Sequence, residues 1–152
     1  MSVYLDVTVL VVYLFGQLKE PNRYETVSGL FDKLQRQEWR ACISLYAFQE
    51  LYAFCEENYP AADVSEVFRL ALLKLLAYSL QIMPLLTRHD RLIYERRFTI
   101  SDASDKPHVI SAHLAGCDAI VSYDQHFQEA TDFIAALTPE ELFVRLNSQE
   151  IQ

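Results

Sequence analysis

Short apolar segments alternate along this chain with longer segments of helical periodicity, and this alternation constrains the fold more than any other feature. Residues 2–5, 40–44 and 119–122 have the composition and length of buried strands, and residues 81–85 are a weaker candidate. Strands separated by helices predict a parallel sheet with helices on both faces. In such sheets, ligands bind beyond the carboxyl ends of the strands. The predicted fold class is therefore α/β.

Apolar residues at helical spacing mark the segments between these strands. The expected helices cover residues 9–18, 24–37, 45–58, 63–78, 87–98 and 106–115. Pro21 is expected to break the chain between the first two, and Thr138 followed by Pro139 predicts a further helix start. Leucines occur on nearly every side of the helix near residues 67–80, which favours either full burial or a dimer interface.

Length and composition fit one globular domain. The chain has 152 residues, of which 51% are hydrophobic and 22% charged, and this balance excludes intrinsic disorder. We assign residues 1–147 to the domain and residues 148–152 to a C-terminal tail. No apolar run reaches the roughly 18 residues of a membrane span, so none is expected. Three widely spaced cysteines suit free thiols in a reducing compartment, which favours the cytoplasm.

The charge balance limits how the protein could meet nucleic acid. The 13 basic and 21 acidic residues give a net charge of −8, which excludes binding by bulk positive charge. An enzyme that acts through metal ions or a local basic patch stays open. Arg88, Arg91 and Arg96 belong to the one basic cluster in the sequence. They are candidates for phosphate contact, although a solvated helix face is the simpler interpretation.

Four acidic residues stand where an α/β sheet would place a ligand. Asp6 and Asp124 each follow a predicted strand, and although either alone could be a cap or turn residue, both point to one crevice. Glu50 lies in the middle of an apolar helix between Ala47 and Ala53, where an unpaired carboxylate is rare. Asp105 precedes another helix, and a role as its N-cap is the simplest interpretation.

The motifs around these acidic residues resemble those of a known family. Residues 105–127 are similar to the C-terminal signature of PIN domains, in which an acid begins a helix, Gly-x-Asp ends it, and a strand leads into Ser-x-Asp. Residues 4–10 resemble the family's first strand with its acid, and residues 133–142 resemble its last strand and closing helix. Glu50 falls where the family has a helical glutamate. The resemblance covers essentially the whole chain.

The resemblance implies a three-layer α/β/α sandwich with a central, mainly parallel sheet. It also implies a metal-dependent nuclease, usually acting on RNA, which in many small bacterial members is a VapC-like toxin held in check by an antitoxin. PIN domains often form homodimers, so a homodimer is expected here. The family's acidic quartet falls on Asp6, Glu50, Asp105 and Asp124. Ser122 matches the family's small hydroxyl residue near the last acid.

Two positions depart from the family pattern. Thr8 stands where Asn or Ser is common, and its hydroxyl cannot supply both functions of an amide. His126 stands where another acid is often found. Because the quartet is intact, we expect metal binding to survive. The rate of catalysis depends on how well Thr8 replaces the Asn or Ser that is common at this position.

The chemistry of the quartet also fits a hard divalent ion. Mg²⁺ and Mn²⁺ prefer oxygen ligands, and an ion offsets the mutual repulsion of converging carboxylates. Our hypothesis is that Asp6 and Asp124 share an ion, with Glu50 and Asp105 as direct or water-mediated ligands. The histidines lack a zinc spacing, so surface or core roles are expected for them, and His126 is close enough to Asp124 to assist.

Other functions stay open on the sequence alone. A haloacid-dehalogenase-like phosphatase would need a second aspartate at position 8, and Thr8 nearly excludes it. A non-catalytic PIN-like module that binds RNA or a protein partner fits the departure at Thr8 and the net charge of −8. A plain structural or dimerisation domain is the third alternative. Any antitoxin is expected to present a basic side chain to the acidic pocket.

Overall fold

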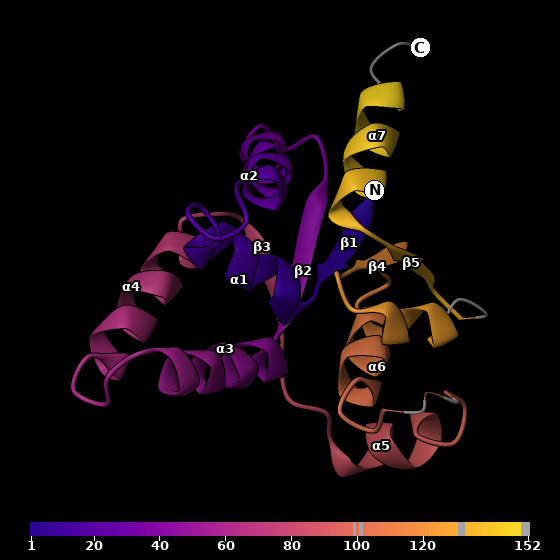
Figure 1. The fold of residues 1–152 in the computed structure, drawn as a ribbon. Coiled ribbons are helices and arrows are strands. Elements are labelled where there is room, and N and C mark those ends of the chain that lie inside the picture. Colours follow the sequence, from indigo (N-terminus) through magenta and orange to yellow (C-terminus); the bar gives the residue numbers. More distant parts are fainter. Residues whose placement is uncertain (99, 101, 131–132, 150–152) are drawn as a thin grey trace.

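Parallel strands form one five-stranded sheet in the order β3–β2–β1–β4–β5 (Figure 1). The computed structural model describes residues 1–98, 100, 102–130 and 133–149. The strands are β1 (Ser2–Leu5), β2 (Arg40–Ser44), β3 (Leu80–Met83), β4 (Ala119–Val121) and β5 (Ala135–Leu137). All four neighbouring pairs run parallel. The α/β fold predicted from the alternation of strands and helices is confirmed.

Helices connect the strands and cover both faces of the sheet. They are α1 (Val7–Phe15), α2 (Pro21–Gln35), α3 (Leu45–Asn58), α4 (Val64–Leu76), α5 (Arg88–Tyr94), α6 (Lys106–Leu114), the 3₁₀ helix η1 (Gln125–Ala130) and α7 (Pro139–Gln149). The three-layer α/β/α sandwich that the family resemblance implied is thus present. Among the described residues, no helix combines the length and apolar character needed to cross a membrane.

Alternation of side chains along the strands builds two separate apolar cores. Val3 and Leu5 of β1 face one core, which they share with α1, α2, α3, α4 and α7. Tyr4 faces the other core, together with α6 and η1. Neighbouring residues of a strand point to opposite faces of the sheet, so one four-residue strand serves both layers. Figure 1 shows these helices on the two sides of the sheet.

The order of the strands reverses beside β1, and this reversal locates the site. From β1 the chain builds outward to β2 and β3, and then returns to place β4 and β5 on the other side of β1. Such a reversal opens a crevice at the carboxyl ends of the two central strands. Asp6 follows β1 and Asp124 follows β4 after two intervening residues, so both acids lie at this edge.

Several boundaries differ from the sequence-based expectation. Pro21 was expected to break the chain, but it occupies the first turn of α2, where the missing N–H costs nothing. α1 ends at Phe15 rather than near residue 18, with Gly16 as its C-cap. α5 is shorter than expected and begins with a capping box between Thr87 and Asp90. α7 extends to Gln149, two residues into the segment assigned to the tail.

The leucine-rich helix α4 buries one face only. Ala71 and Leu75 are buried in the core, whereas Leu70, Leu73 and Leu76 are each more than half exposed. Within the described chain, full burial of this helix is therefore wrong. The outer leucines form an exposed apolar face.

Two leucines of α4 provide a matched test of this packing. Leu75→Ala removes a fully buried side chain, so we expect it to lower the free energy of unfolding by about 2–5 kcal/mol. Leu73→Ala removes a side chain that is 56% exposed in the single chain, so at protein concentrations low enough to give a monomer it should change the same quantity by less than about 0.5 kcal/mol. Urea denaturation of both variants measures the difference. Equal costs would show that α4 packs with another face than the one described.

Candidate metal centre

Asp6 is the most constrained carboxylate at the crevice. It is buried and caps α1 in extended conformation, and its Oδ2 accepts a hydrogen bond from the backbone N–H of Thr8 at 3.2 Å. The hydroxyls of Thr8 and Ser122 donate to the same oxygen at 2.6 and 2.8 Å. All described hydrogen bonds of this side chain therefore go to Oδ2. Oδ1 is left as the oxygen that could bind an ion.

Thr8 and Ser122 join the ends of β1 and β4 through their hydroxyls. The two hydroxyl oxygens lie 3.1 Å apart. The oxygen of Thr8 accepts from the backbone N–H of Tyr123 at 3.1 Å, and that of Ser122 accepts from the N–H of Asp124 at 2.8 Å. These contacts fix the backbone that carries Asp124. A hydroxyl at position 8 thus supports the site by donating to Asp6 and accepting from the loop after β4.

Glu50 meets a partner that the sequence did not reveal. Oε1 of Glu50 accepts a hydrogen bond from Nε2 of His108 at 2.9 Å. The other ring nitrogen, Nδ1, lies 2.8 Å from the hydroxyl of Tyr4, which in turn lies 2.6 Å from the hydroxyl of Ser44. His108 is almost fully buried, whereas the Glu50 side chain is 37% exposed. Ser44 of β2, Tyr4 of β1 and His108 of α6 therefore form a buried series of polar contacts. This series ends at the carboxylate of Glu50.

The neighbouring carboxylates favour the protonated form of His108. Burial opposes its positive charge, but the hydrogen bond and charge of Glu50 act in the other direction. The charges of Asp6 and Asp105 add to this effect. The net result is that the pKa of His108 is raised above its ordinary value. His108 was expected to have a surface or core role, and the structure places it in the core but in contact with the candidate site.

Asp105 is the member of the quartet with a buried carboxylate oxygen that has no hydrogen-bond partner. It occupies the N-cap position of α6, as the sequence suggested, but its side chain makes no capping hydrogen bond. The oxygen without a partner is Oδ2. Burial raises the pKa of Asp105 to about 6, and the charges of Asp102, Asp124 and Asp6 act in the same direction. An unpartnered carboxylate oxygen surrounded by like charges is suited to a cation.

Asp124 lies at the outer side of the crevice and contacts His126. Its Oδ1 accepts from the backbone N–H of His126 at 2.9 Å and lies 3.4 Å from Nδ1 of that ring. The same nitrogen lies 4.0 Å from Oδ2 of Asp105. His126 therefore lies near Asp124, as the sequence suggested, and its ring also approaches Asp105, which the sequence did not predict.

The described side chains gather into two groups that could hold a cation. Single ligand atoms of Asp6, Glu50 and His108 all lie within 4.8 Å of one another, and the same holds for Asp102, Asp105 and His126. The hypothesis that Asp6 and Asp124 share an ion is not what this grouping favours, because Asp6 gathers with Glu50. Asp124 approaches the second group through His126. Carboxylate oxygens dominate both groups, which fits the preference of Mg²⁺ and Mn²⁺.

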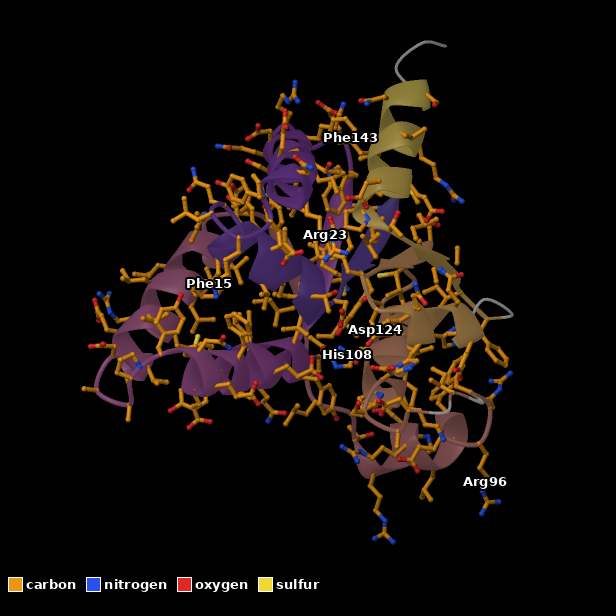
Figure 2. All side chains as sticks on the ribbon, viewed as in Figure 1. Phe15, Arg23, Arg96, His108, Asp124 and Phe143 are labelled. Atoms are coloured by element: carbon orange, nitrogen blue, oxygen red, sulfur yellow. The ribbon has the colours of Figure 1, made fainter. Side chains whose placement is uncertain are left out.

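Arg88 and Arg91 lie on α5 and Arg96 lies just after its end, and none of the three has a described contact with these carboxylates. Arg88, Arg91 and Arg96 are exposed, and Arg91 donates to the hydroxyl of Tyr46 at 3.0 Å. Figure 2 shows Arg96 projecting away from the region of Asp124 and His108. Their exposure fits a solvated face and also leaves them accessible to a phosphate, so phosphate contact stays a prediction. Arg91 alone reaches α3, which also carries Glu50.

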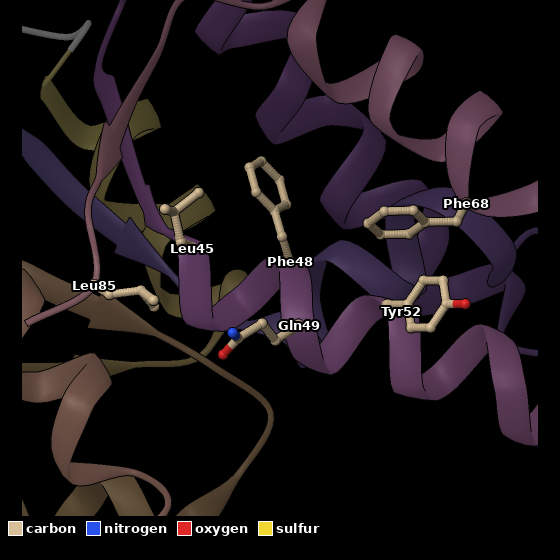
Figure 3. Close-up of a pocket in the computed structure, with 6 residues that line it drawn as sticks. All are labelled: Leu45, Phe48, Gln49, Tyr52, Phe68 and Leu85. Atoms are coloured by element: carbon tan, nitrogen blue, oxygen red, sulfur yellow. The ribbon is translucent and has the colours of Figure 1, made fainter. Parts of the chain in front are cut away.

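An apolar pocket of about 430 Å³ lies on the other side of α3 (Figure 3). Phe48 and Tyr52 line it together with Phe68 of α4. Both α3 residues are two positions from Glu50, about 200° around the helix, so they point away from the carboxylates. This pocket is separate from the candidate metal centre.

Comparison with solved structures identifies the fold. VapBC2 from Rickettsia felis, solved bound to a DNA fragment from its promoter, matches at 12% identity with a TM-score of 0.62, over 91% of this chain and 98% of that chain. VapC20 from Mycobacterium tuberculosis, described as a toxin that cleaves the sarcin–ricin loop, matches at 11% identity with a TM-score of 0.63, over 84% and 94%. VapBC-1 from nontypeable Haemophilus influenzae matches at 13% identity with a TM-score of 0.61, over 92% of this chain and 99% of that chain. The chain has the PIN-domain fold of VapC proteins.

Sequence comparison adds no relative. No protein-family model matches the chain. No curated protein matches it either. The fold therefore rests on the structure, and the resemblance of residues 4–10 and 105–127 to PIN motifs agrees with it.

Asp105 generates a pH-dependent prediction. Its pKa of about 6 lies above the ordinary 3.8, so the folded protein binds this proton more tightly than the unfolded chain. Ionisation then costs stability, and the cost is absent below pH 3.8, grows between the two values and is complete above about pH 6. Asn mimics the neutral form. Asp105→Asn should raise the free energy of unfolding by up to about 3 kcal/mol at neutral pH and by little at pH 4 or below.

Urea denaturation in EDTA across this pH range measures the effect. Asp63→Asn is the matched control, because Asp63 also precedes a helix without a side-chain cap bond and is exposed. A destabilising effect of Asp105→Asn at every pH would contradict the description of Asp105 as unpartnered.

Proposed function

We propose that this protein is a metal-dependent ribonuclease of the PIN type, acting in the cytoplasm as the toxin of a toxin–antitoxin pair. The observation that carries the proposal is that Asp6, at the end of β1, gathers with Glu50, while Asp105, on which the charges of Asp6 and Asp124 act, gathers with Asp102 and His126. A buried carboxylate with an unpartnered oxygen costs stability, and such groups concentrate at functional sites. The fold shared with VapC proteins supports the same conclusion.

The residues present fit a Mg²⁺ or Mn²⁺ ion. Asp6 offers Oδ1, Glu50 offers its half-exposed carboxylate, and Asp105 offers the buried Oδ2. Such an ion, when bound, lowers the pKa of a coordinated water and stabilises charge on a phosphodiester. Asp124 would act from the outer side of the crevice, directly or through water.

The remaining side chains position these ligands. Thr8 and Ser122 hold Oδ2 of Asp6, so the carboxylate cannot rotate freely. His108 holds Glu50 through Nε2 and is itself held by Tyr4 through Nδ1. Ligands whose rotamers are fixed by surrounding hydrogen bonds bind a metal more tightly than free side chains do. The supporting hydroxyls are therefore part of the proposed site.

RNA is the substrate that the comparisons favour. VapC20 is described as cleaving the sarcin–ricin loop, which is RNA, and its chain superimposes along 84% of this one. The net charge of −8 argues against tight binding of a nucleic acid by charge alone. A substrate phosphate would instead meet the carboxylates through the bound cation.

A protein partner is the second part of the proposal. The family resemblance implies a toxin held in check by an antitoxin, and VapC20, which shares this fold, is described as a toxin. An antitoxin that blocks the site would present a basic side chain to the carboxylates, because a desolvated acidic pocket requires a complementary charge.

Cleavage assays with one conservative variant test the nuclease. Wild-type protein should cut labelled single-stranded RNA with Mg²⁺ or Mn²⁺, and EDTA should abolish cutting. Asp6→Asn keeps the shape and the hydrogen bonds to Oδ2 but removes the charge, so it should lower the rate at least about a hundredfold. Asp63→Asn changes an exposed residue ahead of α4, so this variant should cut RNA like the wild type.

Undiminished cleavage by Asp6→Asn would refute the assignment of the site. No cleavage of any RNA by folded wild-type protein would favour the non-catalytic module, which binds RNA or a partner without cutting.

We also propose that the protein is a homodimer. Multi-angle light scattering should give twice the chain mass of 17.6 kDa, because the exposed leucines of α4 form an apolar face of the kind that interfaces cover. A mass of one chain across working concentrations would contradict this expectation.

A further inference from the structure

A second pocket, of about 310 Å³, adjoins the candidate metal centre. Residues of α1, the start of α2, α3 and the loop after β4 line it, among them Thr8, Val11, Glu20, Arg23, Phe54 and Tyr123. It is distinct from the pocket of Figure 3, which faces the other side of α3. None of the proposed metal ligands lines it.

Two hydrogen bonds and one helical spacing place this pocket beside the carboxylates. Thr8, which lines the pocket, donates its hydroxyl to Asp6 at 2.6 Å. Tyr123 donates its backbone N–H to that hydroxyl at 3.1 Å and directly precedes Asp124 in the chain. Phe54 lies four residues after Glu50 on α3, and residues at this spacing share one face of a helix. The pocket therefore lies directly beside the carboxylates.

Aromatic rings and a neutralised charge pair determine what the pocket could hold. Phe54 stacks on Phe15, with ring centroids 5.3 Å apart. The ring of Phe54 is partly exposed, and this packing holds it in place. The guanidinium of Arg23 lies 4.4 Å from the centre of the Tyr123 ring.

The same guanidinium pairs with Glu20 at 2.6 Å, so the two formal charges cancel. A phosphate would gain little here, because the cation is already paired and other carboxylates lie nearby. A flat, neutral group with polar edges is the better match.

We propose that this pocket is a subsite for a nucleobase of the RNA, adjacent to the phosphate that lies at the carboxylates. The inference rests on the proposed nuclease function and names the part of the substrate that is recognised without charge. Bases stack on aromatic side chains and on guanidinium planes, and each stacked base contributes about 1–3 kcal/mol to binding. In a chain with a net charge of −8, such stacking supplies affinity that phosphate contacts cannot.

Binding of three matched oligonucleotides tests the subsite separately from catalysis. The protein carries Asp105→Asn to prevent cleavage, and Mg²⁺ is present throughout. The probes are fluorescein-labelled dodecamers of adenylate, of uridylate and of abasic ribose phosphate, followed by fluorescence anisotropy. The adenylate probe should bind most tightly, because purines stack over a larger area, and the abasic probe should bind least.

Phe54→Leu should lower affinity for the adenylate dodecamer at least about fivefold and leave affinity for the abasic dodecamer unchanged. Phe54→Trp should retain the preference for adenylate, which separates stacking from a loss of folding. Tyr52→Leu is the matched control, because this aromatic residue also lies on α3 but lines the other pocket. It should bind all three probes like the parent.

Two results would overturn the inference while leaving the nuclease intact. One is an equal loss of affinity for the adenylate and abasic probes in Phe54→Leu. The other is a loss of the adenylate preference in Tyr52→Leu instead, which would place the base in the pocket between α3 and α4. Failure of every probe to bind, together with no RNA cleavage by the folded wild-type protein, would refute the proposed function itself.

Discussion

The carboxylate of Asp6 joins parts of the chain that are more than a hundred residues apart. Its Oδ2 accepts from Thr8 at the start of α1 and from Ser122 at the end of β4, while its backbone N–H donates to the carbonyl of Val121. The two central strands are thereby tied at their carboxyl ends. Because both strands are buried on both faces, the crevice between them can hold charge only where such hydrogen bonds stabilise it.

The rest of the site shows what this arrangement costs. Glu50 is held by His108, whose ring is buried against Tyr4, so one carboxylate gains a partner inside the protein. Oδ2 of Asp105 is buried without a hydrogen-bond partner; His126 Nδ1 lies 4.0 Å away, and the charges of Asp102, Asp124 and Asp6 oppose its ionisation. Such imbalance lowers stability unless a cation compensates, which is the usual relation between stability and function at an active site. The buried, unpartnered oxygen of Asp105 is the feature of this site that a bound cation would stabilise.

Much of the fold followed from local sequence patterns. The strand Arg40–Ser44 and the helix Leu45–Asn58 have the bounds that were predicted, because an apolar run and a helical stripe follow each other directly. Pro21 was misjudged, because a proline that breaks one helix also suits the first turn of the next. Asp6 caps α1, which confirms one of the two open interpretations, while its role as a metal ligand stays a prediction.

The partners of the site could not be predicted in the same way. His108 interacts with Glu50 and Tyr4, which lie 58 and 104 residues away, and no local pattern marks such pairs. Its neighbours in sequence, Val109 and Ile110, are core residues, so it resembled a core histidine. The position of Asp105 ahead of a helix suggested a cap, but its side chain bonds no backbone N–H there. Only the folded chain shows that its Oδ2 is buried without a partner.

The central claim is that these carboxylates bind a divalent cation in the crevice between β1 and β4. Anomalous diffraction at the manganese absorption edge, from crystals of the wild-type protein soaked in Mn²⁺, tests it most directly. The account predicts an anomalous peak in contact with Oδ1 of Asp6 and with at least one of Glu50, Asp105 and Asp124, and no such peak in Asp6→Asn. An empty crevice at saturating Mn²⁺, or a peak that persists unchanged in the variant, would contradict it.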